Sequence, residues 1–111
     1  MPTRDEVPEG SAVFPLIPAE LEVHPLLLTA LHAVVFLEGS SDKIVDPTAA
    51  AEQLELIAAC LQRLQGPELQ RVREDLEVLT SFGKEQEWSN DALQFVKSFL
   101  ADYGVGAKSK S

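Results

Sequence analysis

The sequence predicts an all-α protein, a small four-helix bundle-like domain with a central, almost wholly apolar first helix. Ten of the twelve residues at positions 26–37 (LLLTALHAVVFL) are apolar, and a helix that is apolar on nearly all sides belongs inside a core. Three later segments carry apolar residues at spacings of three and four, which is typical of amphipathic helices. We therefore expect the last three helices to pack around the first.

The apolar stretch is too short to cross a membrane, because a span needs about 20 consecutive apolar residues. The residues before it hold five acids and one base, so they lack the basic segment of a secretory signal. Pro25 suits the first turn of a helix, and Gly39 suits the position just after a helix end. The first helix is predicted at residues 25–38, with Leu31 and Val34 in the core.

The second helix is predicted at residues 47–65, because Asp46 is a good N-cap and a proline follows it. A Gly-Pro pair at residues 66–67 separates it from the third helix. A connection this short predicts that the second and third helices are antiparallel neighbours. The third helix is predicted at residues 67–87 and continues past Gly83, because the residues that follow are good helix formers.

The fourth helix is predicted at residues 90–103. Ser89 or Asn90 can cap its start, and Gly104 ends it. One face carries apolar and aromatic residues at helical spacing, which predicts burial of that face. These residues are Ala92, Phe95, Val96, Phe99 and Tyr103.

The two chain ends are predicted to differ from the helical domain at residues 24–104. Residues 1–23 form a Pro-rich acidic arm that is partly disordered, with no order in its first dozen residues. Residues 14–18 (FPLIP) are an apolar patch between prolines. We favour an arm that lies across the helices over a PxxP segment presented to another protein. Residues 105–111 are predicted to be a disordered tail.

The chain is acidic, with 18 acids, 9 bases and a formal net charge of −9. Residues 1–62 hold ten of the acids and two of the bases. This charge argues against nucleic-acid and anionic membrane partners, because affinity for phosphates comes largely from Lys and Arg. It keeps a small protein soluble, and it also favours a basic protein partner. The residues predicted to bind that partner are Glu38, Asp42, Asp46, Glu52 and Glu55.

The sequence shows no group of residues that is typical of an enzyme. Two histidines and one cysteine at unrelated spacings do not resemble a zinc site, which has four ligands in recognisable pairs. Cys60 lies among apolar residues and is expected to be a buried, inert thiol. His32 interrupts the apolar stretch and is expected to be a neutral, structural imidazole. We therefore predict no catalytic site, no cofactor and no metal.

In size, acidity and helical pattern, the chain is similar to bacterial immunity proteins and antitoxins that block basic toxins. This resemblance is one of composition, and the sequence carries no family motif. It implies a cytoplasmic, non-enzymatic inhibitor that binds a protein partner, and the single cysteine fits a reducing compartment. The alternative is a structural subunit or adaptor that forms a homodimer or larger assembly through residues 14–17 or the Trp88 side of the fourth helix.

Overall fold

The computed structural model describes residues 9–105, and this part of the chain contains four α-helices and no strand. The predicted all-α, four-helix class is therefore confirmed. The predictions of disorder at residues 1–8 and 106–111 lie outside the described residues. The elements are a short 3-10 helix, η2 (Ala19–Leu21), followed by α1 (Pro25–Gly39), α2 (Pro47–Leu61), α3 (Gly66–Glu85) and α4 (Asn90–Asp102).

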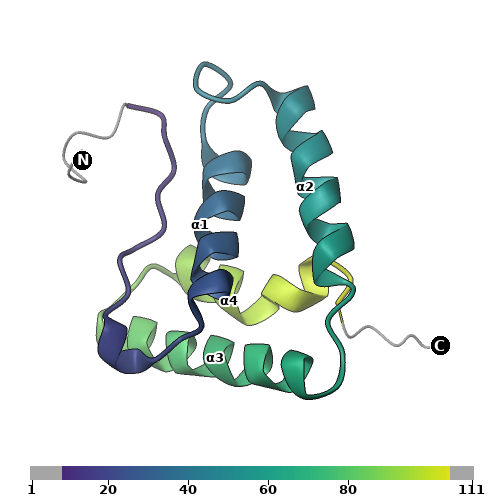
Figure 1. The fold of residues 1–111 in the computed structure, drawn as a ribbon. Helices are drawn as coiled ribbons and strands as arrows, with labels where there is room; N and C mark the ends of the chain where they lie inside the picture. Colours follow the sequence, from purple (N-terminus) through teal and green to yellow (C-terminus); the bar gives the residue numbers. More distant parts are fainter. Residues whose placement is uncertain (1–8, 106–111) are drawn as a thin grey trace.

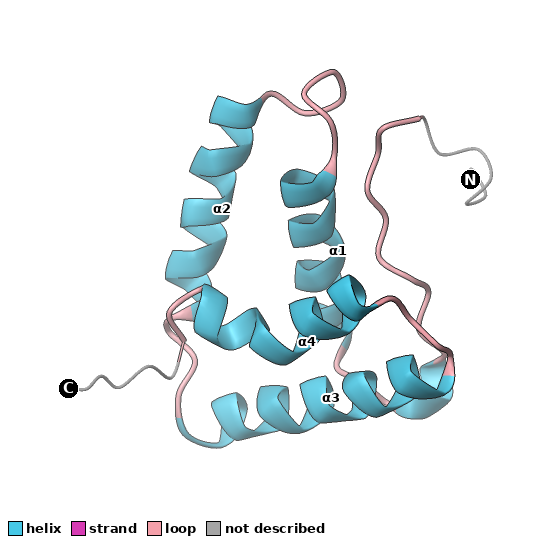
Figure 2. Cartoon of the chain, turned by 180° about the vertical axis from the view of Figure 1, so that it is seen from behind, coloured by secondary structure: helices cyan, strands magenta, loops and turns pink. Residues whose placement is uncertain are grey.

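The helices form two antiparallel pairs. Helices α1 and α2 stand side by side as one hairpin, and α3 and α4 lie across the end of that hairpin (Figures 1 and 2). The prediction that α2 and α3 are antiparallel neighbours is wrong, because α3 turns away and packs chiefly on α4. The short connection between α2 and α3 therefore redirects the chain and does not fold it back.

Helix α2 ends at Leu61, four residues before its predicted end. The N–H of Arg63 donates to the carbonyl of Cys60 at 3.1 Å, and that of Leu64 donates to Leu61 at 3.0 Å. Such bonds over three residues tighten the last turn of a helix and stop it. The remaining residues up to position 65 can therefore turn the chain into α3.

Three helices begin where the sequence predicts. The side chains of His24, Asp46 and Ser89 each accept a hydrogen bond from a backbone N–H in the first turn, at 3.1, 2.9 and 3.1 Å. They satisfy donors that have no partner inside the helix. Local chemistry alone therefore determines the starts of α1, α2 and α4.

The core lies where the N-terminal arm, α1, α3 and α4 meet. Leu31 and Val34 of α1 are 0% exposed, as predicted. Helix α2 adds Ala50, its one buried residue. The main buried cluster contains Phe14, Val23, Leu27, Leu31, Val34, Leu76, Leu79, Val96 and Phe99.

Helix α1 is not enclosed on every side. Leu26 is 73% exposed, and Phe36 is also exposed. The expectation of a central first helix with the other three helices packed around it is therefore corrected. The physical reason is that α2 covers one flank while α3 and α4 cover only one end of the hairpin (Figure 1). Part of the apolar surface of α1 is therefore open to water.

The N-terminal arm runs along α1 (Figure 1). The carbonyl of Gly10 accepts from the N–H of Ser41 at 2.8 Å, and the N–H of Ala12 donates to Oγ of Ser40 at 2.9 Å. Phe14 is 2% exposed. The arm thus lies across the helices, and residues 10–12 contact the loop after α1. The Phe14 ring meets three rings edge-on, those of His32, Trp88 and Phe95.

Helix α3 continues through Gly83, as predicted, and ends at Glu85, two residues before the predicted end. The indole of Trp88 lies so close to Gly83 that a Cβ atom there would overlap it. The N–H of Trp88 donates to the carbonyl of Gly83 at 2.9 Å. The close approach of the indole explains why a glycine lies inside the helix. The hydrogen bond from Trp88 folds the chain back toward α3 and ends the helix.

Helix α4 ends in a Schellman motif. Gly104 has a φ of +73°, and its N–H donates to Ala101 at 3.1 Å, while the N–H of Val105 donates to Leu100 at 2.9 Å. This motif commonly buries an apolar residue just after the glycine. Val105, the residue just after this glycine, is buried.

Candidate protein-binding surface

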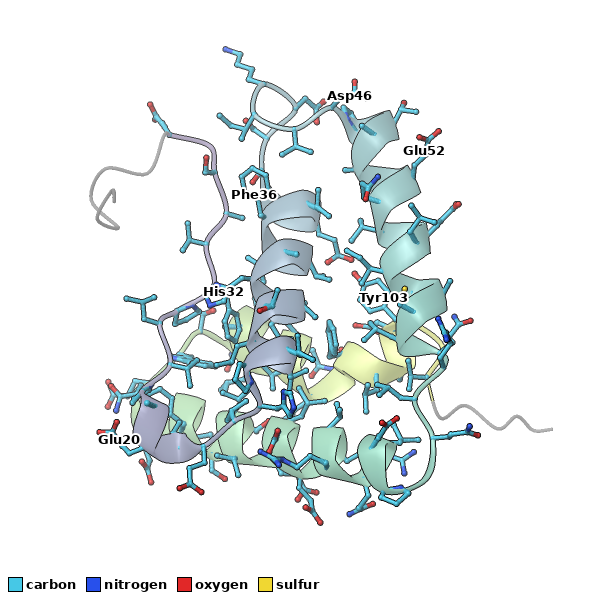
Figure 3. All side chains as sticks on the ribbon, in the orientation of Figure 1. Glu20, His32, Phe36, Asp46, Glu52 and Tyr103 are labelled. Carbon is cyan, nitrogen blue, oxygen red and sulfur yellow. The ribbon has the colours of Figure 1, made fainter. Side chains whose placement is uncertain are left out.

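The five acidic residues predicted to bind a partner are all exposed. Asp42 and Asp46 lie in the loop between α1 and α2, and Glu52 and Glu55 follow on α2. Figure 3 shows Asp46 and Glu52 at the loop end of α2. One carboxylate oxygen of Asp46 accepts from the N–H of Ala49 at 2.9 Å, so this residue has a structural role as an N-cap. Binding of a partner by these residues stays a prediction.

Glu38 differs from the other four acids because its carboxylate accepts a hydrogen bond from the hydroxyl of Tyr103. Tyr103 follows α4 and reaches the space between α1 and α2 (Figure 3). Partial burial, and then the hydrogen bond and the charge of Glu38, raise the pKa of the Tyr103 phenol well above its ordinary value. Glu38 therefore joins the hairpin to α4.

An apolar groove of about 660 Å³ lies between α1, α2 and the start of α3. Each of the three helices supplies one wall, and most of the lining side chains are aliphatic. The α1 side has His24, Leu26, Leu27 and Ala30. The α2 side has Leu56, Ile57, Cys60, Leu61 and, after the helix, Leu64. The α3 side has Pro67, Glu68, Arg71 and Val72.

Two leucines face this groove while remaining largely open to water. Leu26 is 73% exposed and Leu56 is 60% exposed. Single exposed leucines are common, but leucines gathered in one apolar groove mark an interaction site more often. Covering them would gain free energy at about 25 cal/mol per Å² of apolar surface.

Cys60 also lines the groove, and it is exposed. The prediction of a buried thiol is wrong. Cys60 lies on the side of α2 that faces the groove, while Leu54 and Ile57 pack against the core cluster. The only cysteine of the sequence is therefore accessible at the candidate site.

The one cation that lines the groove, within residues 9–105, is already neutralised. Nε of Arg71 lies 3.0 Å from Oδ1 of Asp75, and its Nη2 donates to the carbonyl of Glu22 at 2.9 Å. Asp75 is 6% exposed and also accepts from the N–H of His24 at 3.0 Å. The pair fixes the chain before α1 on α3, and it adds little net charge to the groove.

Glu68 is the remaining charged residue of the groove. It lies in the first turn of α3, where the helix dipole favours an acid. In the described part of the chain, no Lys, Arg or His forms an ion pair with it. The groove therefore combines apolar walls with one negative charge.

A second, smaller hollow of about 420 Å³ lies along α3 beside Leu21. Three glutamates and a serine make this hollow more polar than the groove. Its lining residues are Leu21, Glu74, Glu77, Val78, Ser81, Phe82 and Glu85. Among residues 9–105, no group of three or more His, Cys, Asp or Glu side chains is arranged to hold a metal ion.

Comparisons with protein-family models, curated proteins and solved structures found no match to this chain. None of the helices in residues 9–105 combines the length and apolar character that crossing a membrane requires.

The groove was not predicted from the sequence, although a signal for it exists. Leu56 and Cys60, four residues apart, form an apolar row beside the stripe that contains Leu54 and Ile57. A helix with two apolar rows needs a neighbour for each of them. Because α2 packs chiefly on α1 alone, one row is left open.

Proposed function

We propose that this protein acts without enzymatic chemistry, by binding another protein in the groove between α1, α2 and α3. The observation that carries this proposal is the open apolar groove with the exposed Leu26 and Leu56. Exposed apolar surface of this kind lowers solubility, and it is retained where a partner covers it. The hairpin of α1 and α2 is the binding element, and α3 and α4 support it.

The use of the polar groups around the groove supports a non-enzymatic role. An active site needs several polar groups that converge on one point. Nδ1 of His24 accepts from the N–H of Leu26 at 3.1 Å, and the guanidinium of Arg71 is bound to Asp75 and Glu22. These groups stabilise the fold, which leaves Glu68 as the polar residue that a ligand would meet.

The charge of the protein supports a basic partner. With a net charge of −9, the protein attracts a cationic surface and speeds the encounter with it. Asp42, Glu52 and Glu55 are exposed on the same hairpin as the groove. This combination fits an immunity or antitoxin type of inhibitor that blocks a basic protein in a reducing, cytoplasmic setting.

Affinity capture with the tagged 111-residue chain tests this proposal when groove variants are included. The captured partner is identified from the native cell, and its binding to purified variants is then measured. Leu26→Ser with Leu56→Ser should abolish binding, whereas the control Leu16→Ser, an equally exposed leucine of the arm, should preserve it. Equal binding by all three proteins would contradict a role for the groove.

The acidic residues have a separate test. Replacing Glu52 and Glu55 with Lys should slow association with the basic partner and flatten its salt dependence, because exposed charges act mainly on the association rate. Unchanged association kinetics at low and high salt would remove these residues from the proposed contact.

The second candidate function is a structural subunit that assembles with itself. The exposed Leu16, at 71%, favours it, because the arm presents this side chain outward. Sedimentation at micromolar concentration should show a dimer that Leu16→Ser dissociates. A strictly monomeric protein would exclude this alternative.

A further inference from the structure

We infer that the groove binds an amphipathic α-helix of the partner, with apolar anchors in the groove and a Lys or Arg opposite Glu68. This inference rests on the proposed function and specifies the chemistry of the partner. The structural basis is the pairing of two apolar helix rows with one unpaired acid at the rim.

The walls of the groove have the form that a third helix requires. Leu26 and Ala30 lie one helical turn apart on α1, and Leu56 and Cys60 lie one turn apart on α2. Rows at a spacing of four are the ridges that pack into the grooves of a neighbouring helix. A helix with apolar residues at i, i+3, i+4 and i+7 would insert its own ridge between them.

Charge favours a cationic helix over two other possible occupants of the groove, a second copy of the chain and a fatty acid. A second copy of the chain would bring a second net charge of −9, which opposes association. A fatty acid would bring a carboxylate to a groove in which Glu68 is unpaired and Arg71 is already neutralised by Asp75. A cationic helix gains from both the apolar walls and the rim charge.

Cys60 provides a direct readout, because it is the only cysteine of the sequence and lies in the groove. The probe is a 15-residue peptide with leucines on one helical face and lysines on the other. One control peptide replaces the lysines with glutamates, and another scrambles the leucine and lysine order. The rate of Cys60 alkylation by N-ethylmaleimide is measured with and without each peptide.

We expect the lysine peptide to bind and to protect Cys60. At ten times its Kd, about one protein molecule in eleven is unoccupied, so alkylation should slow about tenfold. Leu56→Asp should abolish the protection and Leu16→Asp should preserve it, each compared with its own rate without peptide. Glu68→Gln should weaken binding by up to about fivefold, the fold-change that corresponds to loss of an exposed ion pair.

Other results would overturn the inference in different ways. Equal protection by the glutamate or scrambled peptide would refute the basic or the helical character of the occupant. Protection by oleate alone would assign the groove to a fatty acid, and protection by higher protein concentration alone would assign it to a second copy. Absence of protection by any peptide would refute helix docking. The proposed function is tested separately, and it fails only if the captured partner binds the Leu26→Ser, Leu56→Ser double variant as well as it binds the wild type.

Discussion

Helices α2 and α4 both carry several large apolar side chains, but they use them differently. Helix α4 buries Val96 and Phe99 completely against the rest of the core. Helix α2 buries only Ala50 and leaves Leu56 mostly exposed. The difference arises from the neighbours, since α4 lies among α3, the arm and α1, whereas α2 packs chiefly on α1.

This comparison separates the part of the molecule that stabilises the fold from the part that is available for binding. The arm, α3, α4 and one side of α1 form the core, where each buried aliphatic side chain contributes about 1.5–3 kcal/mol. The exposed groove residues Leu26 and Leu56 of the α1–α2 hairpin contribute little to that core. Substitutions on the two sides should therefore differ sharply in their effect on the free energy of unfolding.

The largest effect is expected for Leu31→Asp. This side chain is fully buried, and an unpaired charge in a core costs several kcal/mol against a total stability of about 5–15 kcal/mol. Circular dichroism during urea titration should show loss of the folded state. Leu26→Asp replaces an exposed leucine of the same helix and should unfold like the wild type. Similar losses of stability for both variants would show that Leu26 also contributes to the core.

A smaller loss is expected for Asp75→Ala. The carboxylate accepts from the N–H of His24 and from Nε of Arg71, and its removal takes this acceptor away from both donors, while Nη2 of Arg71 keeps its bond to Glu22. Such a loss costs about 1–3 kcal/mol of unfolding free energy, measurable by urea titration. The control Glu77→Ala removes an exposed carboxylate from the same helix and should change stability by less than about 0.5 kcal/mol. Equal effects would show that Asp75 does not hold the arm on α3.

Tyr103→Phe should have a still smaller effect, because the hydroxyl contributes one partly solvated hydrogen bond to Glu38. We expect a loss of about 0.5–1 kcal/mol at pH 7, measured by urea titration. A loss as large as that of Leu31→Asp would contradict the view that this contact only joins the hairpin to α4.

The contribution of Tyr103 should also depend on pH. Its pKa in the folded protein is raised above the ordinary value of 10.0, first by burial and then by the Glu38 hydrogen bond. The folded state therefore holds the phenolic proton more tightly, so this contribution is complete below pH 10 and is lost as the pH rises above it. The wild type should lose more stability than Tyr103→Phe above pH 10, and parallel pH profiles would exclude the raised pKa.

Local sequence signals determined the starts of the helices and the fold class. His24, Asp46 and Ser89 cap helices within three residues of themselves, so spacing and side-chain chemistry suffice to place them. The burial of Leu31 and Val34 also followed from the apolar stretch alone.

Long-range contacts determined the features that the sequence did not predict. Gln62, just after the end of α2, donates from Nε2 to the carbonyl of Tyr103 at 2.8 Å, a contact between residues far apart in the chain. The crossing of α3 over the hairpin determines which face of α2 meets the core, and this leaves Leu56 and Cys60 outside it. The groove depends on that crossing and not on any single helix.

The free energy of unfolding of Leu56→Asp, measured by urea titration beside the wild type, tests most directly whether Leu56 lies in an open groove outside the core. If the groove at Leu56 is open for a partner, the added carboxylate stays hydrated, and the two values should agree within about 0.5 kcal/mol. A loss of several kcal/mol would mean that Leu56 belongs to the core, and the groove would then no longer be a binding site.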